Sequence, residues 1–231
     1  MAPVNFLAHT SVALATGGPD AAADPSYLLG AALPDLASMA GVRLNRARPD
    51  GPVGAGLRCH IVADAVFHAH PAFRDGARAI GAALMHDGLR RGPARAVGHA
   101  GWELLLDGAL VGSEVEAAFH RAFAISREVD VAAAIAGPDR PRWSGFLARW
   151  ERASRASGTG APVRLRYDDP GWVADRLHAM LANRRLLAFP SEDVPTVRRV
   201  LTAHAPPIAD VAGRVLADVT EGVTEMLDCR P

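Results

Sequence analysis

The segment that decides the fold runs from Leu57 to His68 and reads LRCHIVADAVFH. Segments rich in Ala, Leu and Arg favour helices over strands. His60, Asp64 and His68 are spaced four residues apart, so a helix places them one turn apart on nearly the same face. The segment therefore predicts a helix on which an imidazole, a carboxylate and a second imidazole form one row.

A second row with the same spacing follows further along the chain. It consists of His99, Glu103 and Asp107, within a stretch rich in Ala, Leu and Trp. Two helices that carry such rows and pack face to face would gather nitrogen and oxygen ligands around one point, as metal sites in helical bundles do. Buried charges need partners, and a metal ion is an effective one. The two rows together predict a metal site.

The rest of the sequence also favours helices. Hydrophobic residues make up 49% of the 231 residues, enough for a sizeable core, whereas aromatic residues make up only 6%. We expect an all-α helical bundle that forms a single domain over residues 1–231. The helices are expected at residues 6–16, 26–33, 57–68, 73–85, 93–111, 113–125, 128–135, 142–156, 170–183, 194–205 and 207–227.

Several segments are expected to interrupt these helices. Pro34 and Asp35 break the pattern after residue 33, and Arg43 to Gly56 is rich in Pro and Gly and is expected to be a loop. The range 157–160 is expected to be a flexible surface loop. The range 163–167 alternates polar and apolar residues and is the only weak candidate for a strand.

Charge and cysteine content exclude several classes of function. The 25 basic and 25 acidic residues give a formal net charge of zero, which offers no argument for nucleic-acid binding. No stretch of about 20 apolar residues is present to span a membrane. The two cysteines are far apart, and the N-terminus lacks the basic region of a signal peptide. We therefore expect a cytoplasmic protein.

Two further residues are candidate ligands. His9 lies in an otherwise apolar helix, and Asp35 follows a proline in a hydrophobic segment. Each has a structural alternative, since His9 would also suit a hydrogen-bonded core position and Asp35 would suit a helix N-cap. A single pair of His and carboxylate four residues apart is likewise often a surface ion pair. The case for a metal rests on the two rows occurring together.

The motifs, taken in order, resemble a known family. The chain opens with Asn5-Phe6-Leu7-Ala8-His9, continues with Gly30 and Asp35 at a five-residue spacing, and then has Gly56-Leu57-Arg58-Cys59-His60 followed by Asp64 and by Ala69-His70-Pro71. This order and spacing are similar to those of the acyl carrier protein phosphodiesterases, also called phosphopantetheine hydrolases. The likeness covers about the first third of the chain.

The resemblance implies a fold and an activity. It implies a helical fold related to the HD-domain phosphohydrolases. It also implies hydrolysis of the phosphodiester that joins phosphopantetheine to a serine of acyl carrier protein, with a divalent metal that is typically manganese. Acyl carrier protein, or another phosphodiester, is therefore the expected partner.

The sequence departs from the family pattern at several positions. His68 stands where the family has Asp, and His99, with Glu103 and Leu104, stands where the family has Asp and an Asp-His doublet. The added imidazoles make the ligand set softer and suit Mn, Zn or Fe better than Mg. The expected metal ligands are His9, Asp35, His60, Asp64, His68, His99 and Glu103.

Roles in catalysis follow from the same hypothesis. Asp107 or Glu103 is expected to act as general base. Arg90, Arg91 and Arg95 precede the second row and are expected to bind the phosphate, although they also suit a solvated helix start. Two alternatives stay open: a hydrolase like the zinc-dependent phospholipases C, and a relative that binds metal or a partner without turnover.

Overall fold

The structure, a computed structural model, describes residues 5–18, 23–45, 50–127, 131–156 and 165–228. Within these ranges the regular elements are helices, with one isolated β-bridge between Leu44 and Ile135. The all-α prediction is confirmed for the described residues. The α-helices are α1 (Phe6–Thr16), α3 (Pro25–Ala40), α4 (Gly51–Ala69), α5 (Pro71–His86), α6 (Arg91–Gly108), α7 (Glu114–Ala124), α8 (Arg140–Ala156), α9 (Pro170–Leu181) and α10 (Val194–Asp228).

Capping side chains and prolines set where several helices begin. Asp24 accepts a hydrogen bond from the backbone N–H of Ser26 at 2.8 Å and so caps the start of α3. The first turn of a helix tolerates proline, because the N–H group that proline lacks would have no acceptor within the helix there. Pro52 occupies that position in α4. The prediction of a loop from residue 43 to 56 is therefore wrong after residue 50.

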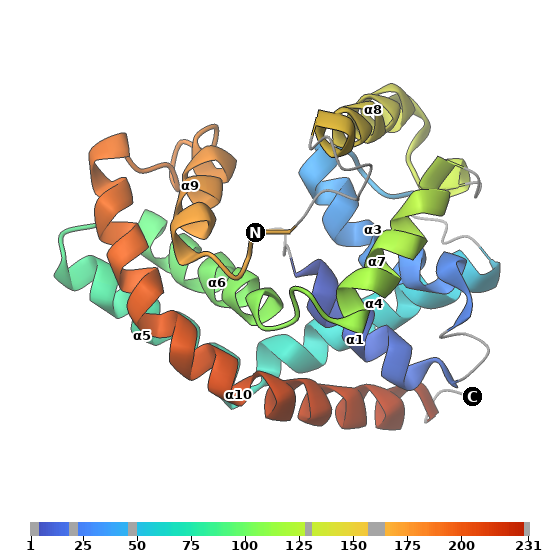
Figure 1. Cartoon of the computed structure of the whole chain (residues 1–231), viewed down its shortest axis with the longest axis horizontal. Helices are drawn as coiled ribbons and strands as arrows, with labels where there is room; N and C mark the ends of the chain where they lie inside the picture. Colours follow the sequence, from blue (N-terminus) through green and yellow to red (C-terminus); the bar gives the residue numbers. More distant parts are fainter. Residues whose placement is uncertain (1–4, 19–22, 46–49, 128–130, 157–164, 229–231) are drawn as a thin grey trace.

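Prolines lie inside two helices without ending them. Pro34 lies within α3, so the expected break there is wrong. Pro206 and Pro207 lie within α10, so the two helices expected at 194–205 and 207–227 are one. A proline removes one backbone hydrogen bond and kinks a helix, and neighbouring packing can hold the kinked helix together. Figure 1 shows α10 bending along its length.

Two weaker predictions also change. Of the helix expected at 128–135, residues 128–130 lie outside the described residues. The described part contains only a short 3-10 turn, Val131–Ala133. Of the strand expected at 163–167, residues 163 and 164 and the loop before them lie outside the described residues. Leu165 to Tyr167 form no strand. Alternating polarity over so few residues is weak evidence, because burial by neighbouring helices can produce it too.

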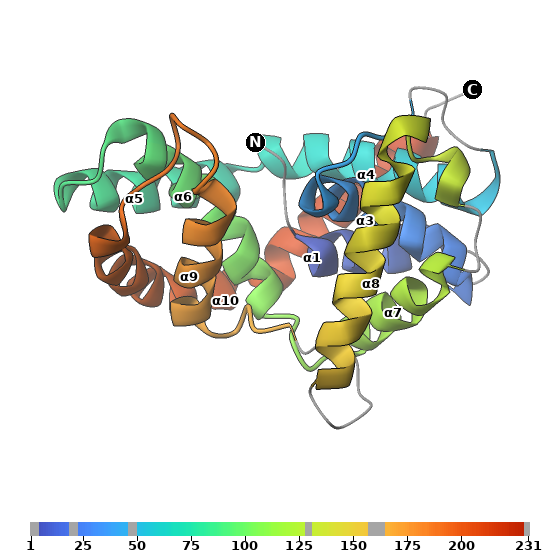
Figure 2. The same ribbon diagram turned by 90° about the horizontal axis from the view of Figure 1, so that it is seen from above.

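Two pairs of neighbouring helices pack against the same long helix, α10. Helix α3 lies along α4, and α5 lies along α6. Helices α5, α6 and α9 occupy one side in both views, while α1, α3, α7 and α8 occupy the other (Figures 1 and 2). Helix α10 contacts α5, α6 and α9 as well as α1 and α4. Its bend therefore lets one helix cover both sides of a common hydrophobic core.

None of the helices in the described ranges combines the length and the apolar character needed to cross a membrane. Their apolar faces are instead covered by one another. Phe6, Leu33, Trp102 and Leu106 are among the largest side chains that are fully buried in this way.

Glycine allows α3 and α4 to approach closely. A Cβ atom at Gly56 would overlap the backbone carbonyl oxygen of Tyr27, and one at Gly30 would overlap that of Val53. Backbone atoms cannot move aside as a flexible side chain can. Both glycines lie near His60 in the helix pair, so this contact also sets how close the His60 row comes to α3.

We predict that Gly56→Ala destabilises the protein by roughly 2–4 kcal/mol, because the added methyl group forces α3 and α4 apart. Gly213→Ala on α10 is the control, since a Cβ atom at Gly213 meets nothing within 4 Å. It should be neutral or stabilising by up to about 1 kcal/mol. Urea unfolding of both variants measures the difference, and equal stabilities would contradict the close helix contact.

Candidate metal centre

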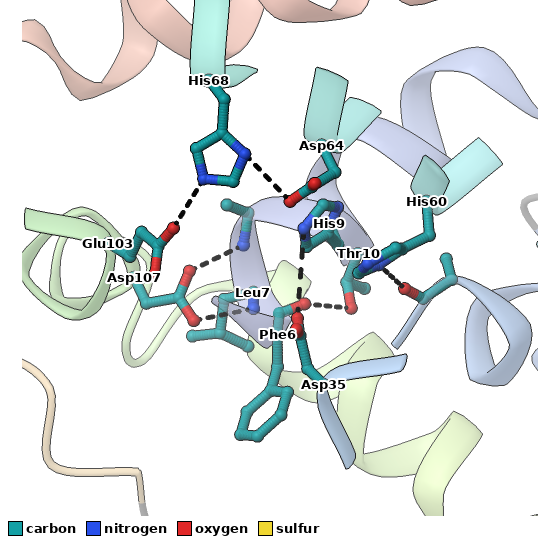
Figure 3. A network of polar contacts seen from close by, with 12 residues as sticks. Phe6, Leu7, His9, Thr10, Asp35, His60, Asp64, His68, Glu103 and Asp107 are labelled. Carbon is teal, nitrogen blue, oxygen red and sulfur yellow. Dashed lines mark hydrogen bonds and ion pairs between the residues drawn. The ribbon is translucent and has the colours of Figure 1, made fainter. Parts of the chain in front are cut away.

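The structure brings both predicted rows to one place. Side chains from α4 and α6 meet there, and α1 and α3 contribute His9 and Asp35 (Figure 3). Imidazoles and carboxylates from all of these helices point toward one another. The residues gathered there are His9, Asp35, His60, Asp64, His68, His99, Glu103 and Asp107.

One group of possible ligands consists of His9, His60 and Asp64. Each offers one ligand atom, and these atoms lie within 4.8 Å of one another. The Nδ1 atom of His60 lies 2.8 Å from the carbonyl oxygen of Ala31. Since a carbonyl can only accept, Nδ1 carries the proton and the lone pair of Nε2 is left free to bind a cation.

A second group consists of His68, His99 and Glu103, whose ligand atoms also lie within 4.8 Å of one another. The Oε1 atom of Glu103 lies 3.0 Å from Nε2 of His68 and 3.1 Å from Nε2 of His99. The other ring nitrogen of His68, Nδ1, lies 3.3 Å from Oδ1 of Asp64, which belongs to the first group. His68 therefore joins the two groups into one centre.

The proton on His68 balances the carboxylates on either side of it. Burial alone would lower the pKa of His68, but the hydrogen bonds that its ring N–H groups donate to Asp64 and Glu103 outweigh burial and raise this pKa to about 10. For Asp64, burial opposes ionisation, yet the hydrogen bond to His68 lowers its pKa below the usual value. At neutral pH a positively charged His68 imidazolium thus lies between Asp64 and Glu103.

His9 and Asp35 form a buried pair that lacks such compensation. Their side chains are 3% and 0% exposed, and Nε2 of His9 lies 4.0 Å from Oδ2 of Asp35. Burial raises the pKa of Asp35 well above its usual value and lowers that of His9 well below. No described residue forms a hydrogen bond with Nε2 of His9 or with either carboxylate oxygen of Asp35.

These unsatisfied atoms fit a divalent cation. Buried polar atoms without partners are rare in native proteins and call for an explanation. Burial also lowers the pKa of His60 to about 4, so its imidazole is neutral and ready to coordinate. A set of imidazole nitrogens and carboxylate oxygens suits Mn, Zn or Fe. The structure therefore brings together the imidazoles and carboxylates that the sequence puts forward as ligands.

Asp107 has a different position from the one expected for a general base. Its Oδ2 accepts a hydrogen bond from the backbone N–H of Leu7 at 3.0 Å, and its Oδ1 accepts one from that of Ala8 at 2.8 Å. These are N–H groups of the first turn of α1, where the N-cap residue Asn5 makes no side-chain cap. Asp107 thus acts as a cap supplied from α6, and both of its oxygens are occupied.

The predicted arginines separate into two environments. Arg91 and Arg95 line a cleft of about 450 Å³ that also includes His99. Arg90 instead donates a hydrogen bond from Nη2 to the carbonyl oxygen of Ala188 at 3.0 Å. The cleft has two further arginines on α5 that the sequence reasoning missed, Arg74 and Arg78. Their spacing of four residues was the available signal.

Comparisons of the chain with protein-family models, with curated proteins and with solved structures find no match in any of the three.

We predict that Asp35→Asn stabilises the metal-free protein by roughly 1–3 kcal/mol at pH 7, because it removes the cost of burying a carboxylate. The folded-state pKa of Asp35 is raised, so its contribution to stability is fully present below about pH 4 and is lost as the pH rises through the folded pKa. The advantage of the variant should therefore grow as the pH rises from 4.

Thermal unfolding in chelator between pH 4 and 8 measures this effect. Asp210→Asn, at an exposed position on α10, is the control and should change stability by less than about 0.5 kcal/mol at every pH. A loss of stability in Asp35→Asn at neutral pH would show that the carboxylate has a structural partner.

We also predict that Asp107→Ala costs roughly 2–4 kcal/mol of stability, because it removes a buried cap and leaves two N–H groups of α1 without acceptors. Hydrogen exchange should speed up most at the amides of Leu7 and Ala8. If Asp107→Ala instead kept full stability and protection while losing activity, the role of general base would stand.

Proposed function

We propose that the protein is a metal-dependent hydrolase of phosphoric diesters. The observation that carries this proposal is the meeting of two groups of possible ligands, His9/His60/Asp64 and His68/His99/Glu103, beside buried atoms without a described hydrogen-bond partner, which belong to His9, Asp35, Asp64, His99 and Glu103. His68 would give up its proton on binding a cation. Metal-assisted hydrolysis is the chemistry that such a mixed set of imidazoles and carboxylates serves best.

The family resemblance supports the same proposal independently. His9, Asp35, His60 and Asp64 were taken from separate motifs along the first third of the chain, and they lie together in the structure. We therefore propose an HD-like phosphodiesterase that resembles the acyl carrier protein phosphodiesterases. The positions that depart from the family pattern, His68, His99 and Glu103, also meet, which favours a site with altered ligands over one that has decayed.

A divalent cation held by these residues would polarise a phosphoryl oxygen and lower the pKa of a water molecule at the site. The protein's own groups have the remaining tasks. The Oε2 atom of Glu103 has no described partner, so this oxygen is available to accept a proton from the attacking water. Arg95 lines the cleft beside His99, so its guanidinium is the nearest predicted group to neutralise charge on the phosphate.

We predict that protein purified without chelator contains a stoichiometric divalent metal, measured by mass spectrometry. His60→Ala and His99→Ala should each lose most of the metal, because the two groups share His68 and its neighbouring carboxylates. His86→Ala changes an exposed histidine at the end of α5 and should keep the metal. Absence of metal from the wild type, even after incubation with Mn and Zn, would refute the proposal.

Hydrolysis of bis-p-nitrophenyl phosphate in the presence of Mn or Zn tests the activity. Glu103→Gln should lower kcat by about 10²-fold or more, since it removes the proposed base. Release of phosphopantetheine from acyl carrier protein tests the substrate implied by the resemblance. Tight metal binding without turnover of any diester would instead indicate the non-catalytic alternative, and activity on phospholipids alone would indicate the phospholipase-like one.

A further inference from the structure

We propose that the cleft lined by Arg74, Arg78, Arg91 and Arg95, which we call the arginine cleft, binds a second phosphate group of a small-molecule substrate. Arg74, Arg78 and Arg91 would hold this phosphate, remote from the cleaved phosphate that Arg95 neutralises beside His99. This inference rests on the proposed function, because it concerns the substrate of the same centre. It narrows the substrate class to phosphodiesters of small molecules that carry a further phosphate.

The geometry of α6 connects the arginine cleft to the metal centre. Arg91, Arg95 and His99 follow one another at spacings of four residues, and all line the same cleft. The row of His99, Glu103 and Asp107 continues the same spacing into the core. Each step of four residues advances about 6 Å along a helix, so Arg95 lies about one step and Arg91 about two steps, roughly 12 Å, from His99. One phosphate at the centre and another beside Arg91 therefore fit one elongated ligand.

The charge of the arginine cleft is poorly compensated. Arg78 pairs with Asp75 at 2.7 Å from Nη1 to Oδ1. Within the described parts of the chain no acidic side chain forms an ion pair with Arg74, Arg91 or Arg95. Like charges one helical turn apart repel each other by about 0.2–0.5 kcal/mol per pair at exposed positions such as these, and a bound anion would relieve this repulsion.

A second cleft of similar size shows the opposite arrangement. It has a volume of about 420 Å³ and lies between α9 and α10, with Arg166 and Arg198 in its lining. Arg166 pairs with Asp169 at 2.7 Å, and Arg198 pairs with Asp175 at 3.1 Å. Both arginines of the second cleft are thus paired with carboxylates, whereas in the arginine cleft only Arg78 has such a partner among the described residues.

The shape and lining of the cleft favour a small molecule. Its volume of about 450 Å³ lies within the range of small-molecule sites, roughly 300–1,000 Å³. Phe73, Ala77 and Met85 provide apolar surface between the arginines. A ligand with two phosphates joined by a compact, partly apolar body would satisfy both kinds of surface, whereas a protein partner would cover a broader area.

Calorimetry with inorganic pyrophosphate on the metal-free protein tests the arginine cleft alone. We expect Arg74→Gln and Arg91→Gln each to weaken binding about tenfold, as the loss of a charge-assisted hydrogen bond would. Arg198→Gln, in the second cleft, should change affinity less than about twofold. Equal affinity in all variants would mean diffuse surface attraction and would overturn the proposal, as would an absence of binding.

Two matched substrates then connect the cleft to catalysis. Thymidine 5′-(p-nitrophenyl phosphate) with a 3′-phosphate should have a lower KM than the same compound without it. Arg91→Gln should raise KM about tenfold for the first compound only, with kcat unchanged. Equal effects on both compounds, or competition by an acidic carrier protein but not by pyrophosphate, would overturn the small-molecule assignment. If pyrophosphate binds but neither compound is hydrolysed, the arginine cleft stands and the proposed function fails.

Discussion

The pair of hydrogen bonds from the backbone of α1 to the carboxylate of Asp107 is the interaction on which the rest of the centre depends. It replaces the cap that Asn5 does not make and fixes the start of α1 against α6. His9 follows Ala8 directly, so the placement of its imidazole beside His60 is a consequence of this attachment. Without these hydrogen bonds, α1 could shift relative to the possible ligands on α4 and α6. A buried carboxylate that caps a helix thus lies one turn from Glu103, the residue that we propose as general base.

The centre also illustrates how a fold tolerates buried charge. His68 carries a proton between Asp64 and Glu103 and so serves as an internal cation. No such cation serves Asp35, whose oxygens and neighbouring His9 remain unsatisfied among the described residues. A protein selected for stability alone would fill this space with apolar side chains, which bury more favourably than unpaired polar groups. The two arrangements lie side by side in this site, and the uncompensated one is the part of it that a bound cation would stabilise.

Sequence reasoning succeeded where a local pattern decides the structure. The bounds of α1 and the four-residue rows on α4 and α6 follow from helical periodicity, and the structure contains them as expected. It failed where distant contacts decide. Pro34 and Pro206 end a helix in isolation, but packing against neighbouring helices keeps α3 and α10 continuous. Asp107 as a cap and Arg74 in the cleft both depend on how α6 meets another helix, and no spacing within one segment contains that information.

The order of contacts along the chain has a consequence for how the protein assembles. The pairs α3–α4 and α5–α6 join neighbours in sequence and can form early, whereas the bonds of Leu7 and Ala8 to Asp107 close loops of 100 and 99 residues. The centre lies between these units, so we expect it to be completed late in folding. Interactions that form after the transition state mainly slow unfolding. A cation bound there would therefore lower the unfolding rate of the protein and change its folding rate little.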